Sequence, residues 1–219
     1  MSGLCVIAGT RWIEMIAAAA AAIGKRQDDL NALDSTVGDG DHGTNIAAAL
    51  AKAAASVTEL PEPAPEAVLN EVGSTLATEM GGAAGVIFGA FFRGAALGTA
   101  GKAGIDAPQY VEVLRSGLKE VQKWGKARPG DKTMVDALAA ALRAAEAAVA
   151  QQQSLEVVMQ VAAAAAHQGA EATTAMEARK GRARFLGPRA IGFQDAGATS
   201  IALLLSAWSE VVCTNATNP

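Results

Sequence analysis

The chain has 219 residues and a formal net charge of −4, and 51% of its residues are apolar although only 4% are aromatic. The length is enough for one domain with a substantial core, residues 1–219, and does not require a second domain. The acidic balance argues against general nucleic-acid binding. Much of the apolar fraction is alanine, a strong helix former, so we expect packed helices rather than sheets.

Eight helical segments are predicted along the chain, and no run alternates as a strand would. They fall near residues 10–30, 44–58, 65–79, 84–101, 107–125, 132–151, 155–178 and 198–213. Prolines and glycines separate most of these segments, as in the turn Arg128-Pro129-Gly130. The longest stretch without a helical pattern is 179–196, which contains Gly187 and Pro188.

The termini give no sign of export. Cys5 and Cys213 form no metal-type or CxxC spacing, and we interpret them as a reduced pair, although a disulfide is the alternative. Arg11 and Glu14 interrupt the apolar N-terminal run, which argues against a signal peptide. No stretch reaches the roughly 18 apolar residues of a membrane span. We therefore expect a soluble, cytoplasmic protein without a membrane partner.

The most unusual segment is 34–45, which places Asp34, Asp39 and Asp41 within eight residues. Carboxylates this close repel one another unless protons or cations intervene. An oxygen-only ligand set suits Mg²⁺, or Mn²⁺, better than zinc. An EF-hand does not fit, because Leu50 or Asn45 stands where the loop needs its final glutamate. A solvated acidic turn is the alternative to a metal site.

Four polar or glycine-rich loops precede the second, fourth, sixth and eighth predicted helices. They span residues 39–45, 81–85, 130–133 and 195–200. In an up-and-down array, alternate helices start at the same end, so these loops are expected to share one rim. Helix N-termini bind anions through free N–H groups and the helix dipole. Together with the aspartates, the loops predict a metal-bridged phosphate site.

Several side chains allow a structural and a functional interpretation. His42 is either a helix cap or a contact to phosphate or ribose. Lys132 and Arg182 either neutralise phosphate or are surface charges, and Met134 lies either against adenine or in the core. The tryptophans are interpreted as packing residues; they are Trp12, Trp124 and Trp208.

Five motifs occur in an order that is specific when taken together. They are Gly38-Asp39-Gly40-Asp41-His42-Gly43, Met80 to Gly85, Gly130 to Asp136, Gly181 to Gly187, and Asp195 to Ala198. With these motifs the chain resembles the nucleotide-binding L subunits of dihydroxyacetone kinases, the Dak2 or DhaL domain family. The resemblance implies an all-α barrel of about eight mostly antiparallel helices, with the nucleotide site at one end.

The resemblance also implies ligands for particular residues. Asp34, Asp39 and Asp41 would hold two Mg²⁺ ions (or Mn²⁺) that bridge to the phosphates of ADP or ATP. The nucleotide would be bound by His42, Gly43, Thr44, Asn45, Ala83, Ala84, Gly125, Met134, Arg182, Asp195, Ala196 and Gly197. Ala84 stands where the family usually has a hydroxyl residue, and Phe193 and Ala196 replace the His and Pro of its His-x-Asp-Pro-Gly motif.

The function implied is that of a phosphotransferase subunit. It would pass a phosphoryl group to a ketose held on a separate K-type subunit, with bound ADP recharged by a phosphotransferase-system protein. One alternative is an ATP-using subunit that acts on a related ketose such as erythrulose. A second is a non-catalytic, nucleotide-dependent regulator that binds a transcription factor, and a third is a metal-dependent hydrolase.

Overall fold

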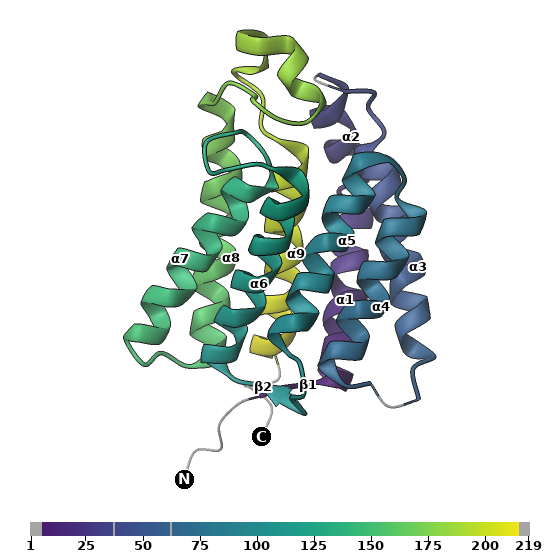
Figure 1. Ribbon diagram of the computed structural model, residues 1–219, viewed down its shortest axis with the longest axis vertical. Coiled ribbons are helices and arrows are strands. Elements are labelled where there is room, and N and C mark those ends of the chain that lie inside the picture. Colours follow the sequence, from purple (N-terminus) through teal and green to yellow (C-terminus); the bar gives the residue numbers. More distant parts are fainter. Residues whose placement is uncertain (1–5, 37, 62, 215–219) are drawn as a thin grey trace.

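The protein is a closed ring of long helices, described here by a computed structural model for residues 6–36, 38–61 and 63–214 (Figure 1). The helices run up and down along the long axis of the molecule. The α-helices of the described residues are α1 (Gly9–Lys25), α2 (Gln27–Ser35), α3 (His42–Thr58), α4 (Pro65–Glu79), α5 (Gly82–Gly98), α6 (Ala107–Gly125), α7 (Met134–Ala150), α8 (Leu155–Ala172) and α9 (Ala196–Thr214).

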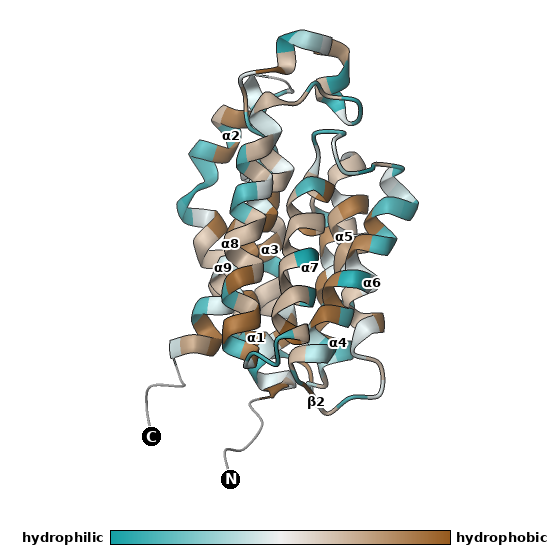
Figure 2. Ribbon diagram, turned by 90° about the vertical axis from the view of Figure 1, so that its left-hand side faces the viewer, coloured by the Kyte–Doolittle hydropathy of each residue, from teal (hydrophilic) through white to brown (hydrophobic). Residues whose placement is uncertain are grey.

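The order of contacts closes the ring. From α3 to α9 each helix packs against the next one in the sequence, α3 packs against α1, and α9 returns to α1. Short α2 lies outside this circuit, against α3 and α9. The prediction of an all-α barrel of about eight helices is therefore confirmed. Figure 2 shows hydrophobic residues along the packed helices and hydrophilic residues on outward faces and in loops.

An aromatic cluster fills the centre of the barrel. The rings of Trp12 in α1 and Trp208 in α9 meet edge to face, with centroids 5.0 Å apart. Phe91 and Phe92 in α5 place their rings 6.2 and 6.0 Å from Trp208. All four side chains are fully buried. Edge-to-face and offset pairs add to the burial of these large side chains, so the cluster ties opposite walls of the ring together.

The first predicted helix is wrong in one respect: it is two helices, broken at Arg26. The backbone of Arg26 leaves the helical region (φ −111°, ψ 14°), and its side chain pairs with Asp29 in the first turn of α2. The break lets α2 turn and pack against α3. As a result, Asp34 lies in the last turn of α2 rather than in a loop.

The predicted helix 155–178 also ends early, at Ala172. It is followed by η1 (Thr173–Ala175) and by η2 (Arg182–Ala190), a 3₁₀ segment kinked at Gly187 inside the stretch expected to be non-helical. Residues 174–192 are called the cap segment below; they lie above one end of the barrel (Figure 1). Two-residue strands β1 (Ile7–Ala8) and β2 (Gly104–Ile105), which were not predicted, pair antiparallel at the opposite end.

Helix α9 corrects the expectation about membrane spans. Among the described residues it is the one helix long and apolar enough to cross a membrane by length and composition. However, 67% of its apolar window is buried inside the barrel, so its side chains already serve the core. The interpretation of Cys5 and Cys213 as a reduced pair stays a prediction, because Cys5 lies outside the described residues. Cys213, in α9, accepts a hydrogen bond from the Gln160 side chain at 3.2 Å.

The packing of α5 on α6 predicts the cost of adding one methyl group. A Cβ at Gly94 would lie 2.5 Å from the backbone oxygen of Ser116, whereas a Cβ at Gly24, near the end of α1, would meet nothing within 4 Å. Gly94→Ala should lower the free energy of unfolding by about 1–3 kcal/mol, the usual cost of overpacking. Gly24→Ala should raise it by about 0.5–1 kcal/mol through helix propensity. Urea denaturation measures both values, and equal effects would contradict this packing.

Candidate functional site

A cavity of about 1030 Å³ opens at the capped end of the barrel. Its walls come from the starts of α3, α5, α7 and α9, from the C-terminal end of α6 and from the cap segment. The four loops that the sequence placed on one rim therefore do meet around one cavity. Because each loop leads into a helix start, the cavity is surrounded by the positive ends of four helix dipoles.

Most of the residues proposed from the sequence line this cavity. They are Asp34, Asp39, Asp41, His42, Asn45, Ala83, Ala84, Gly125, Met134, Arg182, Asp195, Ala196 and Gly197. Gly43 and Thr44 do not line it. Gly43 lies so close to α2 that a Cβ would overlap the backbone oxygen of Gln27. Thr44 exchanges two hydrogen bonds with the Asn31 side chain, at 2.9 and 3.0 Å, so these two residues join α3 to α2.

Residues 38–41, called the acidic loop below, fold around the carboxylate of Asp34 at the end of α2. One oxygen of this carboxylate accepts hydrogen bonds from the backbone N–H groups of Gly40 and Asp41, at 2.9 and 3.2 Å. Gly40 has a positive φ of 76°, which permits the turn. As a result, Asp34, Asp39 and Asp41 each offer a carboxylate oxygen within 4.8 Å of the other two. Three hard oxygen donors this close together fit a hard divalent cation such as Mg²⁺.

Arg182 is the basic partner of this cluster. Its guanidinium forms an ion pair with Asp39 across the mouth of the cavity. The hydrogen bond from Arg182 lowers the pKa of Asp39, so this carboxylate stays ionised. Both side chains are at least half exposed, so the pair adds little to stability. The ion pair instead joins the cap segment to the acidic loop.

His42 begins α3 beneath the acidic loop. Its Nε2 lies 2.9 Å from the Ser200 hydroxyl in α9. That hydroxyl donates its own proton to the carbonyl of Ala196, so it accepts the proton of Nε2. Burial lowers the pKa of His42, and the charges of Asp34 and Asp41 oppose this shift only in part. The hydrogen bond of His42 to Ser200 joins α3 to α9.

The start of α5 forms an open wall of the cavity. Gly81 and Gly82 have positive φ values of 67° and 57°, a conformation that favours glycine. An added Cβ at either residue would meet nothing within 4 Å. The glycines are thus needed for the backbone turn, and they leave free space in front of Ala83 and Ala84. A phosphate could approach the N–H groups of this helix start closely.

A buried Lys and a partly buried Asp form the opposite wall. The Lys132 side chain is 2% exposed, and its ammonium donates to the carbonyls of Thr173 and Phe193. The sequence offered Lys132 as a phosphate or surface charge; burial excludes the surface interpretation. Burial also raises the pKa of Asp195 to about 6, although the Ala198 amide, 2.7 Å away, and Lys132 favour its charged form.

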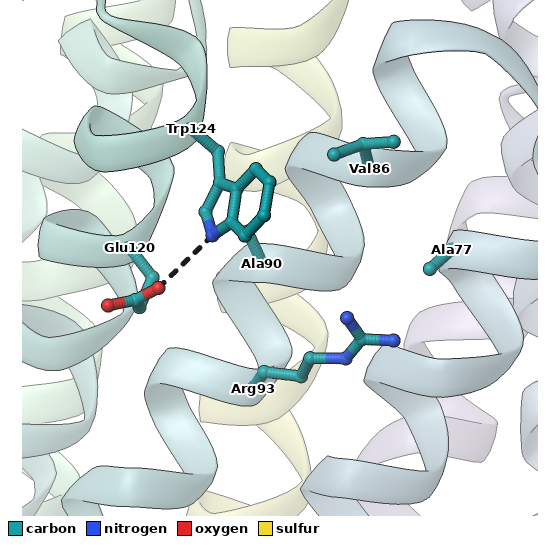
Figure 3. Close-up of a pocket in the computed structure, with 6 residues that line it drawn as sticks. All are labelled: Ala77, Val86, Ala90, Arg93, Glu120 and Trp124. Atoms are coloured by element: carbon teal, nitrogen blue, oxygen red, sulfur yellow. Dashed lines mark hydrogen bonds between the residues drawn. The ribbon is translucent and has the colours of Figure 1, made fainter.

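Trp124 was expected to be a packing residue, but it is 58% exposed. It lines the large cavity and also a hollow of about 220 Å³ between α4, α5 and α6 (Figure 3). Its indole N–H donates to Glu120 at 3.2 Å, and Arg93 lies across the same hollow. One feature of the sequence could have indicated that Trp124 lines the cavity. It is the neighbour of Gly125, a proposed site residue, at the end of its helix.

Comparison with known proteins agrees with this geometry. Residues 36–210 match the model of the Dak2 family, described as the DAK2 domain. The chain is 36% identical to the Escherichia coli protein named PEP-dependent dihydroxyacetone kinase, ADP-binding subunit DhaL, over 80% of this chain and 84% of that protein. It is 38% identical to the D-erythrulose kinase of Mycolicibacterium smegmatis, over 85% of this chain and 32% of that one.

A solved structure shows the same arrangement of helices. The dihydroxyacetone kinase from C. freundii, crystallised in complex with AMP-PNP and Mg²⁺, superposes with a TM-score of 0.70 at 31% identity. The match covers 94% of this chain and 35% of that kinase. The chain therefore spans about a third of these two larger kinases and most of the length of the E. coli subunit.

The raised pKa of Asp195 predicts a pH dependence of stability. The pKa of Asp195 is about 6 in the folded protein against 3.8 for an ordinary aspartate. The group therefore destabilises the fold increasingly as pH rises through that window. Asp195→Asn, which keeps an oxygen for the Ala198 amide, should become more stable than the parent by at most about 3 kcal/mol above pH 6. Urea unfolding at pH 4, 5, 6 and 7 measures the difference. A difference that does not change with pH would contradict the prediction.

Proposed function

The chain belongs to the DAK2 domain family, and on this premise we propose that it is the nucleotide-binding subunit of a dihydroxyacetone kinase. It would pass a phosphoryl group to dihydroxyacetone held on a separate K-type subunit. Relatives that are similar over most of their length are named ADP-binding subunits of PEP-dependent or PTS-dependent kinases. This supports ADP as a bound coenzyme, recharged in the cytoplasm by a phosphotransferase-system protein.

One observation carries this proposal: three carboxylates with oxygens within 4.8 Å of one another stand at the mouth of a cavity formed by helix starts. Alone, these carboxylates would repel a phosphate chain. Mg²⁺ held by these carboxylates would supply positive charge that offsets the charge of the phosphates. We propose two ions, held by Asp34, Asp39 and Asp41, with Mn²⁺ as a substitute. When bound, the metal neutralises charge on the transferring phosphoryl group.

The protein's own groups supply binding and orientation. The start of α5 would present the backbone N–H groups of Ala83 and Ala84 to phosphate. This contact does not need the hydroxyl side chain that the family usually carries in place of Ala84. Arg182 offers a planar guanidinium at the mouth, where phosphoryl charge would be exposed. Met134 is 5% exposed, lines the cavity and lies close to Gly197. There it would form an apolar floor for the base.

The alternative is an ATP-using kinase subunit for a related ketose. It is favoured by the similarity to D-erythrulose kinase, although the chain spans only 32% of that enzyme. Coverage of 84% of the E. coli ADP-binding subunit favours the coenzyme form instead. Binding to a transcription regulator remains a further proposal, and it would use the same nucleotide-bound state.

The metal ligands give the first functional prediction. Asp39→Ala or Asp41→Ala should weaken ADP binding in Mg²⁺ by more than about 100-fold, because even outer partners of metal sites are worth about 10–100-fold in metal affinity. Asp28→Ala, on the exposed face of α2, is the matched control and should bind normally. Isothermal titration calorimetry measures all three. Unchanged affinity in both site variants would exclude the metal bridge.

The proposed division of labour predicts an incomplete enzyme. The purified chain should not phosphorylate dihydroxyacetone with ATP or with a phosphotransferase-system donor, because the ketose is bound elsewhere. Adding a K-type subunit with a suitable donor should restore turnover, followed by a coupled assay of triose phosphate. Turnover by the isolated chain would refute the separate substrate subunit.

Arg182 gives a test of the cap segment. A guanidinium makes paired hydrogen bonds to phosphate that an ammonium cannot reproduce. Arg182→Lys should therefore weaken ADP binding by about 1–3 kcal/mol. Arg189→Lys, in the same 3₁₀ segment but outside the cavity lining, should change it little. Equal effects in fluorescence titrations of the two variants would mean that the cap carries only general surface charge.

A further inference from the structure

Lys132 has an unusual environment for a lysine. It lies between α6 and α7 with a left-handed backbone (φ 61°) and a side chain that is 2% exposed. Burial lowers its pKa, and only Asp195 and Asp136 oppose this shift. Burying an ammonium is costly unless hydrogen bonds compensate for the lost water. The two acceptors of Lys132 therefore indicate what this lysine does.

Those acceptors flank the cap segment on its two sides. The ammonium donates to the carbonyl of Thr173, at 2.6 Å, and to the carbonyl of Phe193. Thr173 immediately precedes the cap segment and Phe193 immediately follows it. Two further hydrogen bonds join the two ends of the cap. The Gly192 N–H donates to the Thr174 carbonyl at 2.8 Å, and the Asp195 N–H donates to the Thr173 hydroxyl at 2.9 Å.

Beyond these hydrogen bonds, the cap also has apolar packing of its own. Ala178, Ala183 and Ala190 form a small apolar cluster with Leu186, separate from the barrel core. Arg182 and Phe185 extend from the cap into the lining of the cavity, and Phe185 is 74% exposed. A segment with its own small core is oriented by its points of attachment. The attachments are the two carbonyls held by Lys132 and one bond inside the cap, from the Arg179 N–H to the carbonyl of Asp131 at 3.1 Å. Together they set where Arg182 stands relative to Asp39.

We propose that Lys132 is a positioning residue that clamps the two ends of the cap segment and so holds Arg182 over the acidic loop. Lys132 belongs to the lining of the cavity, but its ammonium is directed to the Thr173 and Phe193 carbonyls, so it acts through the cap. The role rests on the proposed function, because Arg182 matters only if a phosphate binds there. The clamp itself is a property of the folded chain and can be measured without any ligand.

Hydrogen exchange of the full chain, followed by mass spectrometry, tests the clamp. Lys132→Met, which keeps the length of the side chain but no donor, should raise exchange in residues 174–192 by about tenfold or more through local opening. Exchange in α1 and α5 should not change. Lys119→Met, on the exposed face of α6, is the matched control and should leave the cap unchanged. A folded Lys132→Met protein with an unaltered cap would overturn the proposal.

A double-mutant cycle then separates positioning from direct contact. Lys132→Met should raise the Kd for ADP in Mg²⁺ by about tenfold when Arg182 is present, but by less than about threefold in an Arg182→Ala background. Equal losses in both backgrounds would mean that Lys132 touches the nucleotide, which also overturns the proposal.

The remaining outcomes are decisive as well. If Lys132→Met folds poorly, Lys132→Gln retains a donor on a shorter side chain and should show the same pattern at smaller amplitude. If neither variant folds, Lys132 supports the whole barrel, which contradicts a role confined to the cap. If exchange rises but the parent protein binds no ADP, the clamp stands and the proposed function fails.

Discussion

Repulsion among Asp34, Asp39 and Asp41 is the constraint on which the rest of the site depends. The chain holds the three carboxylates together in spite of this repulsion, by wrapping backbone N–H groups around Asp34 and by placing Arg182 against Asp39. One guanidinium cannot balance three carboxylates. The cluster therefore repels anions and attracts hard cations. We therefore propose that a phosphate chain enters this site together with metal.

The barrel supplies the other half of the site. Because its long helices alternate in direction around a closed ring, the starts of α3, α5, α7 and α9 meet at the same end. The aromatic cluster around Trp208 keeps opposite walls at a fixed distance. Positive helix ends, an acidic loop and a basic cap thus face a single cavity. Under the proposed function, this arrangement would position a charged ligand without a catalytic base of its own.

The sequence predicted the parts of this structure that follow from local chemistry. The alanine-rich pattern predicted the helices, and the glycine-rich and polar loops predicted the shared rim. Both features depend on residues that are close together in the sequence. The break at Arg26 was missed because Gln27 to Ser35 continues a helical pattern, and only packing on α3 turns it away. The burial of Lys132 was missed because its two acceptors lie 41 and 61 residues away. The exposure of Trp124 likewise depends on where α4, α5 and α6 meet.

Native mass spectrometry of the full chain tests the central claim most directly. With ADP and Mg²⁺ present, a complex of one chain, one ADP and two metal ions is expected. Removing the metal with EDTA should release the nucleotide together with the ions, because the carboxylates then repel its phosphates. A chain that remains free of nucleotide in Mg²⁺, or that keeps ADP equally well after EDTA, would contradict a metal-bridged nucleotide site at the acidic loop.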